Sequence, residues 1–253
     1  KRSAKRLDLM CQYGLTAAIE AVNDSGLTVS ENVDEDEIGV VAGTGIGGIM
    51  TLENEVRKAE ARGMSRVSAL LVPMVIPNIP AGNISIQFGA KGSSLGLVTA
   101  CAAGTHSIGE AFRQIKHGYL KAVIAGGSEA AFAPACFSGF ANMTAISTKK
   151  DKNRCSIPFD KERDGFVMGE GSGMVILEEL NHALNRNAKI YAEIIGYGST
   201  CDAYHLTSPS PDGEGAAKAM ANAIKEAGIK NEDVDYINAH GTGTPYNDLF
   251  ETI

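Results

Sequence analysis

Apolar residues recur along the chain at two spacings, one typical of helices and one typical of buried strands. Stretches with apolar positions at helical spacing predict helices at 5–25, 50–63, 107–117, 182–188 and 214–228. Short apolar runs rich in β-branched residues predict strands at 37–42, 95–100, 121–127, 173–180, 189–198 and 234–241. Because helices and strands alternate, the pattern predicts an α/β fold with buried sheets.

Composition indicates a folded domain and argues against several kinds of partner. The 253 residues are 44% hydrophobic and 21% charged, with a net charge of −7, so we expect a sizeable core and no nucleic acid as a partner. No apolar run approaches the roughly 18 residues of a membrane span, and no secretory signal opens the sequence, so no membrane partner is expected. The five cysteines are widely spaced without a C-x-x-C pair. This spacing argues against a disulfide framework or zinc site and favours a reducing compartment.

A glycine-rich turn follows the first predicted strand. The segment GTGIGG matches the dinucleotide pattern G-x-G-x-x-G at Gly43, Gly45 and Gly48. That pattern needs a second strand ending in an acidic residue about 20 residues further on, and EARGMSRVSALLVP does not provide one. The favoured interpretation is a tight turn in which glycine allows close backbone approach. A third interpretation is that Ile46 points from this turn into an apolar pocket.

The segment LVTACAAGTHSIGEAF places Cys101 where a predicted buried strand turns into a helix. A thiol at a helix start faces unpaired N–H groups and the positive end of the helix dipole, which favour the nucleophilic thiolate. The same N–H groups can stabilise an oxyanion on a bound thioester. A buried structural cysteine is the commoner fate of a thiol, so both interpretations stay open. His106 lies about 140° around the helix from Cys101, which predicts a hydrogen-bonded structural histidine.

The segment NAHGTGTPYND supplies a candidate partner for the thiol. His240 follows a predicted buried strand, in a loop of the kind where α/β proteins place active-site groups. Its imidazole can act as a hydrogen-bond donor or a base at neutral pH, and Thr242 and Thr244 add short donors. A cysteine at one strand end and a histidine at another make a Cys/His pair plausible.

Four segments in this order resemble the β-ketoacyl-acyl-carrier-protein synthases of fatty acid synthesis: TACAAGTHSIG, FDKERDGFVMGEGSG, DAYHLTSPSPDG and AHGTGTPYND. The likeness is strongest for the type II condensing enzymes that elongate medium and long acyl chains. Type I synthases and polyketide ketosynthases share these motifs. The resemblance implies a thiolase-like fold of five alternating layers, built from two βαβαβαββ halves. Residues 1–188 would be most of the first half and 189–253 the opening of the second.

The resemblance also implies roles for particular residues. Cys101 matches the acyl-accepting nucleophile, whose own N–H supplies part of the oxyanion hole, and His240 matches the first of two catalytic histidines. Substrate-binding positions are matched by Thr242 and Thr244 for the pantetheine arm, Thr207 at the tunnel mouth, and Ile46 and Phe140 beside the acyl pocket. The resemblance implies no metal or redox cofactor, and the substrate brings its own pantetheine.

The implied reaction is a decarboxylative Claisen condensation of malonyl-carrier protein with an acyl group held on Cys101. We expect a homodimer in the cytoplasm, or in an organelle stroma such as that of plastids. The basic runs KRSAKR and KKDKNR fit either a solvated face or a docking surface for an acidic partner. With the resemblance, acyl carrier protein is expected to dock on basic side chains despite the net charge of −7. The candidates are Arg2, Lys5, Arg6, Lys149 and Lys150.

Two rival functions differ in sequence features. A thiolase would use coenzyme A and a second cysteine as base, and the HGTGTP segment favours a synthase instead. A non-catalytic subunit of the chain-length-factor type replaces the nucleophile, so Cys101 argues against it. Both ends of the sequence look cut, and the family's second histidine, lysine and gating loop would lie beyond Ile253. We therefore expect the 253-residue chain by itself to be inactive in condensation.

Overall fold

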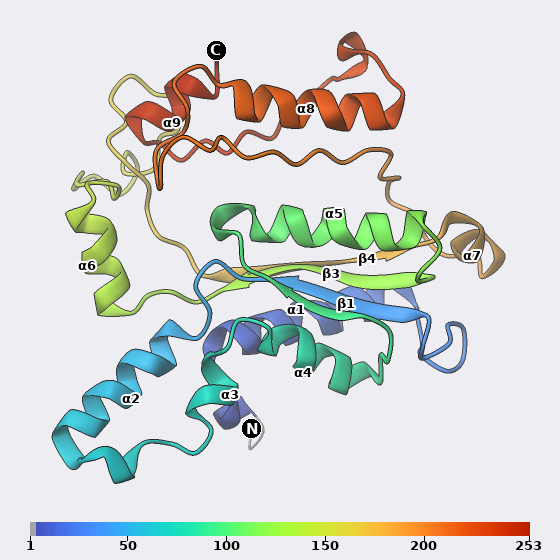
Figure 1. The fold of residues 1–253 in the computed structure, drawn as a ribbon, viewed down its shortest axis with the longest axis horizontal. Coiled ribbons are helices and arrows are strands. Elements are labelled where there is room, and N and C mark those ends of the chain that lie inside the picture. Colours follow the sequence, from blue (N-terminus) through green and yellow to red (C-terminus); the bar gives the residue numbers. More distant parts are fainter. Residues whose placement is uncertain (1–3) are drawn as a thin grey trace. The chain divides into compact units, whose positions relative to one another are not determined.

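A four-stranded mixed sheet forms the centre of the first of two units in the computed structural model, which describes residues 4–253 (Figure 1). This unit takes the described residues up to Ala133 together with Gly169–Ala192. The second unit takes Pro134–Met168 and Glu193–Ile253. The boundary expected near residue 189 concerns the halves of a family fold and stays a prediction.

The strands of the first unit are β1 (Ile38–Gly43), β2 (Ser94–Leu97), β3 (Ala122–Glu129) and β4 (Gly171–Glu178), in the order β2-β1-β3-β4. Strand β1 pairs in parallel with β2 and β3, and β4 runs antiparallel to β3. Gly43 is in register with both Leu97 and Gly127. The carboxyl ends of the three parallel strands therefore meet at one edge of the sheet.

Helices cover both faces of this sheet. Helices α1 (Leu9–Ser25) and α4 (Ile79–Phe88) pack on one face, and α5 (Ala103–Lys116) packs on the other (Figure 1). Successive strand residues point to opposite faces, so Ile124 joins the core beneath α1 and α4 whereas Val123 joins the core beneath α5. Both side chains are fully buried, and truncating a core isoleucine to alanine costs about 2–5 kcal/mol.

The remaining helices of the first unit are α2 (Ile49–Arg62), α3 (Leu71–Val75) and α7 (Leu180–Asn185), with short 3₁₀ turns at Ala4–Arg6, Met64–Arg66 and Ala100–Ala102. Buried Asp8 links two helix starts. Its Oδ1 accepts a hydrogen bond from the N–H of Met10 in α1 at 2.9 Å, and its Oδ2 accepts one from the hydroxyl of Thr51 in α2 at 2.5 Å. Gly26 ends α1 in the left-handed conformation with φ 65°, as its sequence position predicts.

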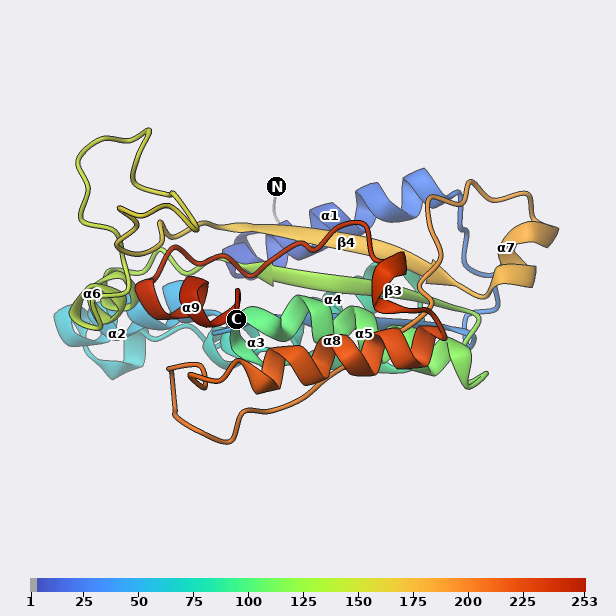
Figure 2. The same ribbon diagram turned by 90° about the horizontal axis from the view of Figure 1, so that it is seen from above.

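The second unit contains α6 (Pro134–Asn142), α8 (Glu214–Ala227), α9 (Pro245–Phe250) and a 3₁₀ turn at Asn231–Asp233 (Figure 2). Between α6 and β4 the chain forms a long loop stabilised by turns and one isolated bridge between Ile146 and Phe166. A Cβ built on Gly198 would lie 1.9 Å from the carbonyl oxygen of Ala219. The segment around Gly198 therefore contacts α8 backbone to backbone.

Three strand predictions need correction. Residues 189–198 and 234–241 form no ladder with any described residue, and apolar side chains such as Ile237, 62% exposed, are not buried. Their composition favours extended backbone, but a strand exists only where a neighbour completes its hydrogen bonds. The strand predicted at 95–100 is present as β2, but as an edge strand with Leu95 exposed, not as a buried one.

Candidate active site

The carboxyl edge of the sheet in the first unit carries the candidate nucleophile. After β2 ends at Leu97, the chain forms the 3₁₀ turn Ala100–Ala102 and continues directly into α5. Cys101 lies within this turn and is exposed. Its predicted position at the start of a helix is confirmed, although the strand before it is not buried.

Backbone strain and close packing fix this turn. Ala100 has φ 51°, a left-handed conformation that is uncommon for a residue with a side chain and is often found at functional sites. A Cβ on Gly43 would lie 2.5 Å from the carbonyl oxygen of Ala103, and one on Gly127 would lie 3.1 Å from the Cα of Gly104. Glycine at the end of β1 and near the end of β3 thus lets the start of α5 rest directly on the sheet.

The cysteines differ in their environments. Cys11 is completely buried in α1, and burial, with a smaller effect of the Asp8 carboxylate, raises its pKa to about 12. A thiol with that pKa is protonated and unreactive at neutral pH. Cys101 instead lies at the positive end of the dipole of α5, where a thiolate is favoured. His106, one turn later, forms a 2.7 Å hydrogen bond through Nδ1 with the hydroxyl of Thr99, which confirms the predicted hydrogen-bonded role.

The glycine-rich turn after β1 is occupied by the protein's own carboxylate. Glu129 accepts a hydrogen bond from the N–H of Gly45 at 2.7 Å and another from the hydroxyl of Thr44 at 3.1 Å. A dinucleotide loop needs its N–H groups for phosphate, and a carboxylate here repels one. The tight-turn interpretation is confirmed, since a Cβ on Gly48 would lie 2.6 Å from the carbonyl oxygen of Met74.

His240 belongs to the second unit, in the loop that precedes α9. Glu251 of α9 accepts hydrogen bonds from the N–H groups of His240 at 2.5 Å and Gly241 at 2.8 Å. The hydroxyls of Thr242 and Thr244 lie 2.8 Å apart and share a hydrogen bond. The structure therefore brings His240, Thr242 and Thr244 together in one loop, with the His240 side chain exposed.

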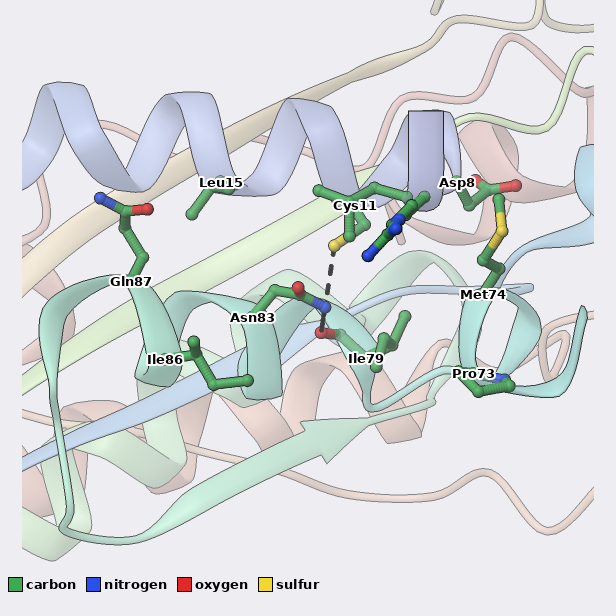
Figure 3. A pocket seen from close by; sticks show the side chains of 11 residues that line it. Asp8, Cys11, Leu15, Pro73, Met74, Ile79, Asn83, Ile86 and Gln87 are labelled. Carbon is green, nitrogen blue, oxygen red and sulfur yellow. Dashed lines mark hydrogen bonds between the residues drawn. The ribbon is translucent and has the colours of Figure 1, made fainter. Parts of the chain in front are cut away.

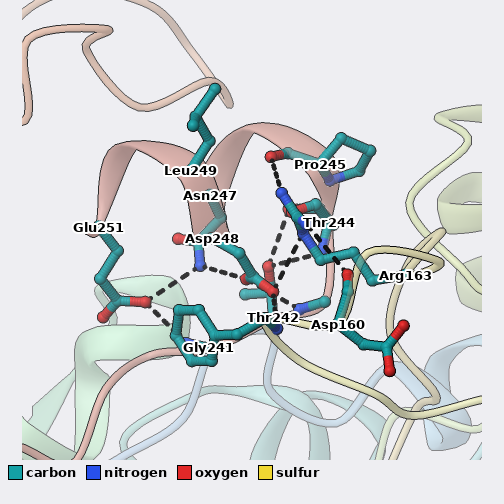
Figure 4. Close-up of polar contacts among 12 residues, drawn as sticks. Asp160, Arg163, Gly241, Thr242, Thr244, Pro245, Asn247, Asp248, Leu249 and Glu251 are labelled. Carbon is teal, nitrogen blue, oxygen red and sulfur yellow. Dashed lines mark hydrogen bonds and ion pairs between the residues drawn. The ribbon is translucent and has the colours of Figure 1, made fainter. Parts of the chain in front are cut away.

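Buried Asp248 anchors this loop from α9. Its carboxylate accepts hydrogen bonds from the N–H groups of Phe159 at 2.7 Å and Gly243 at 3.0 Å, and it pairs with Nε of Arg163 at 3.3 Å. Arg163 also donates to the carbonyl oxygen of Pro245 at 2.8 Å. The loop that contains Phe159 and Arg163 is thereby joined to the loop of His240 (Figure 4).

The other predicted site residues lie at separate places. Phe140 in α6 packs edge to face on Phe166, with ring centroids 5.4 Å apart. Thr207 is exposed in the loop before α8, where its N–H donates to Nδ1 of His205 at 3.1 Å. Ile46 lies in the glycine-rich turn of the first unit and is 38% exposed. In the His240 loop, the hydroxyls of Thr242 and Thr244 are in direct contact, and Glu251 binds the backbone of His240 and Gly241.

A separate cavity of about 620 Å³ opens beside α1 (Figure 3). It is lined by α1, α3 and α4, and includes Met74, Asn83 and the buried Cys11, whose Sγ is 4.0 Å from the carbonyl oxygen of Ile79. The cavity is lined by Arg6, one of the predicted docking residues, but by none of the predicted catalytic or substrate-binding residues. Within residues 4–253 no cluster of three or more His, Cys, Asp or Glu side chains is arranged to hold a metal ion. Across the same residues, the helices are all too short or too polar to span a bilayer.

Comparison with family models identifies the chain. The N-terminal domain of beta-ketoacyl synthases matches residues 1–183, and the C-terminal domain of the same family matches residues 191–253. The chain belongs to the beta-ketoacyl synthase family.

Relatives and solved structures agree with this assignment. The chain is 52% identical to 3-oxoacyl-[acyl-carrier-protein] synthase 2 of Synechocystis sp. over all 253 residues, and 49% identical to the synthase 2 of Staphylococcus aureus over 251 residues. It spans 61% and 62% of the length of these two relatives. A ketosynthase in complex with a type II polyketide acyl carrier protein matches 96% of this chain and 61% of its own, with a TM-score of 0.91 and 33% identity. A beta-ketoacyl synthase from Burkholderia phymatum matches 100% of this chain and 61% of its own, with a TM-score of 0.88 and 30% identity. The fold is the thiolase-like ketosynthase fold, as the sequence predicts.

The structure of this beta-ketoacyl synthase family member also reveals polar residues that sequence reasoning missed. Glu129, Arg163, Asp248 and Glu251 each bind backbone groups of a candidate site loop. Asp248 and Glu251 follow the predicted loop within two helical turns, so their closeness to it in the sequence could have identified them as contact residues. Nothing in the local sequence around Glu129 indicates its contact with the turn at Gly45.

Proposed function

We propose that the protein is a 3-oxoacyl-[acyl-carrier-protein] synthase that elongates fatty acids by decarboxylative condensation. The observation that carries this proposal is Cys101, an exposed thiol at the start of α5 beyond the carboxyl edge of the sheet. Identities of 49–52% to the synthases named above, against 33% to the ketosynthase of the type II polyketide complex, favour fatty acid elongation over polyketide synthesis.

The first step is acyl transfer to Cys101. Its thiolate attacks the carbonyl carbon of an acyl-carrier-protein thioester, and the negative charge moves to the carbonyl oxygen. Backbone N–H groups at the start of α5, including that of Cys101, are assigned to stabilise this oxyanion. The bond between the acyl carbon and the pantetheine sulfur then breaks, and the carrier protein leaves as a thiolate. The acyl group remains on Sγ of Cys101.

The second step is condensation. Malonyl-carrier protein loses its carboxylate as carbon dioxide, and the electron pair of the broken bond forms an enolate on the remaining thioester. His240 is assigned to donate a hydrogen bond to that enolate oxygen. The enolate carbon attacks the acyl carbon on Cys101, a carbon–carbon bond forms, and the Cys101 thiolate is released. Thr242 and Thr244 are assigned to hydrogen-bond the pantetheine arm. Both steps balance in atoms and electrons without a metal or redox cofactor.

Ile46 and Phe140 are each assigned to contact the acyl chain, and Thr207 is assigned to a place where the chain enters. Ile46 supports this assignment because it is the large apolar side chain of the turn next to Ala100, and it is partly exposed. A bulkier residue at that position would shorten the space for the chain.

Acyl carrier protein is proposed as the partner. A solved ketosynthase similar to this chain was captured with its acyl carrier protein. Lys5, Arg6 and Lys150 are exposed and Lys149 is half-buried, whereas Arg2 lies outside the described residues. Local basic groups steer an acidic partner even on a protein of negative net charge, because screening limits the reach of distant charges.

We propose a homodimer in a reducing compartment, either cytoplasm or an organelle stroma. Strand β2 lies at the edge of the sheet that the described residues form, and its exposed residue Leu95 and the following Val98, 50% exposed, present apolar surface there. Edge strands of this kind are templates for pairing with another chain. All five cysteines are free thiols, which supports the choice of compartment.

Mass spectrometry of the protein expressed from its complete gene tests the proposal. After incubation with acyl-carrier protein, the acyl mass should appear on the peptide that contains Cys101 and be absent from the Cys101→Ala variant. Cys201→Ala is the matched control, because Cys201 is also exposed, and it should still be acylated. Carbon dioxide release that depends on malonyl-carrier protein then tests condensation. Absence of acylation would instead favour a non-catalytic, chain-length-factor type of subunit.

A further inference from the structure

The glycine-rich turn between β1 and α2 is held by a network that centres on Glu129, the last residue of β3. The hydroxyl of Thr44 donates to Oε1 of Glu129 at 3.1 Å, and the N–H of Gly45 donates to Oε2 at 2.7 Å. The oxygen of Thr44 also accepts a hydrogen bond from the N–H of Gly47 at 3.1 Å. Glu129 therefore binds the turn directly at two residues and indirectly at a third.

This network lies against the turn that carries the nucleophile. A Cβ built on Gly45 would lie 2.9 Å from Oε2 of Glu129 and 3.5 Å from both the Cα and the carbonyl oxygen of Ala100. Ala100 is the strained residue immediately before Cys101. Gly45 thus fits between the carboxylate and the turn of Cys101, and a shift of either one displaces the glycine-rich turn.

Ile46 is the residue that such a shift would move. It lies between Gly45, which Glu129 holds, and Gly47, which Thr44 holds. At the far end of the turn, the N–H of Gly48 donates to the carbonyl oxygen of Val75 at 3.0 Å. Because Thr44 is buried whereas Ile46 is partly exposed, the turn is anchored at its ends and by Glu129, and its middle is the part that can move.

We propose that Glu129 is a positioning residue that holds Thr44 and Gly45 so that Ile46 stands at a fixed place beside the acyl chain, and that it thereby sets which acyl lengths Cys101 accepts. This inference rests on the proposed function, since it takes Cys101 as the nucleophile and Ile46 as a wall of the acyl pocket. Glu129 acts through Ile46 and touches no reacting atom in this scheme.

The chemistry of the network explains why a carboxylate is required. Two donors converge on the side chain, and a carboxylate accepts with both oxygens. The amide of Glu129→Gln has the same shape but only one acceptor oxygen. The N–H of Gly45 cannot turn away, so the oxygen stays with Gly45 and the amide NH₂ faces Thr44. The hydroxyl of Thr44 must then point its hydrogen elsewhere, and both remaining contacts lose the help of the negative charge.

Acyl-length profiles of the protein expressed from its complete gene test the inference. We would measure kcat/KM with a short, a medium and a long acyl-carrier-protein thioester for wild type, Glu129→Gln and Ile46→Ala. Loss of one charge-assisted hydrogen bond corresponds to about a tenfold change in an equilibrium or rate constant. The ratio of long-donor to short-donor kcat/KM should therefore change by roughly that factor in Glu129→Gln, in the same direction as in Ile46→Ala. In the double variant the two changes should not add, because both act through one side chain.

Glu170→Gln is the matched control. Among the hydrogen bonds of the described residues, its carboxylate accepts one from the N–H of Phe132 at 2.9 Å and none from the glycine-rich turn. This variant should keep the wild-type length profile. If Glu129→Gln folds poorly, Thr44→Val removes the same contact from the other partner and should shift the profile in the same direction.

The outcomes separate the inference from the proposed function. Equal loss for all donor lengths in Glu129→Gln and Thr44→Val, or no loss, would mean that the carboxylate only stabilises the fold, and would overturn the inference. A wild-type protein that neither acylates Cys101 nor condenses would instead overturn the proposed function.

Discussion

Replacing Asp248 by Asn should destabilise the second unit strongly although the two side chains have the same shape. Asp248 is 2% exposed, and its carboxylate accepts from the N–H groups of Phe159 and Gly243 on different oxygens. An asparagine has one acceptor oxygen, so its NH₂ must face one of these N–H groups. The substitution also leaves Arg163, whose side chain is 19% exposed, without its counter-charge.

These losses set the size of the effect. Breaking a buried ion pair from one side costs about 3–5 kcal/mol. Because Arg163 keeps some contact with solvent and still donates to the carbonyl oxygens of Asp160 and Pro245, the lower end applies. We expect the free energy of unfolding to fall by about 3 kcal/mol. Activity that depends on His240 should fall as well, because Asp248 holds the loop at Gly243.

Urea unfolding followed by circular dichroism measures this change. Glu214→Gln is the matched control, since Glu214 in α8 pairs with Lys218 while both side chains are about two-thirds exposed, at 64% and 66%. Exposed pairs of this kind contribute little, so this variant should unfold with the wild type. If Asp248→Asn also unfolds with the wild type, the contacts of Asp248 do not hold the second unit together.

Four further predictions concern the site, the docking residues and the first unit. Limiting iodoacetamide should label Cys101 before the other cysteines, as peptide mapping will measure; faster labelling of Cys155 or Cys201 would contradict its assignment. Ile46→Phe should lose long acyl donors before short ones, because overpacking costs about 1–3 kcal/mol; equal loss at every length would remove Ile46 from the pocket. Charge reversal at Lys149 and Lys150 should raise KM for acyl-carrier protein and leave a simple acyl thioester unaffected, whereas equal effects would indicate misfolding. Burial acts to raise the pKa of Glu178, but hydrogen bonds from Arg186 and His182 outweigh it and lower the pKa. The stability that Glu178 supplies is therefore present at neutral pH and is lost as the pH falls below the ordinary pKa of 4.5. Urea unfolding at neutral pH and at a pH below 4.5 should show a smaller acid-induced fall in the free energy of unfolding for Glu178→Gln than for wild type.

Elements with their own packing partners could be predicted from the sequence. The apolar runs 37–42 and 121–127 became β1 and β3 because parallel strands covered on both faces need continuous apolar residues. The helical spacing in 50–63 and 214–228 became α2 and α8. The start of α5 at Ala103, directly after the turn that contains Cys101, follows from its small residues, which allow close approach to the sheet.

Elements and contacts that depend on distant residues could not be predicted. The composition of 234–241 favours a strand, yet strand formation requires a neighbour that no local pattern supplies. Likewise, the contact of Glu129 with Gly45 joins residues 84 positions apart. Their proximity is a consequence of the pairing of β1 with β3, and the spacing of these residues in the sequence does not indicate it.

The division of the second unit into two stretches has a consequence for its folding during synthesis. Phe159 lies 89 positions before Asp248, and Arg163 lies 82 positions before Pro245. At roughly 5–20 residues per second, the ribosome needs on the order of 5 to 20 seconds to make the intervening chain. During that interval β4 can already complete the sheet of the first unit, while the loop from Ser147 to Met168 has none of its later partners. This nascent loop is therefore the stretch of the unfinished protein that proteases would cleave and chaperones would bind.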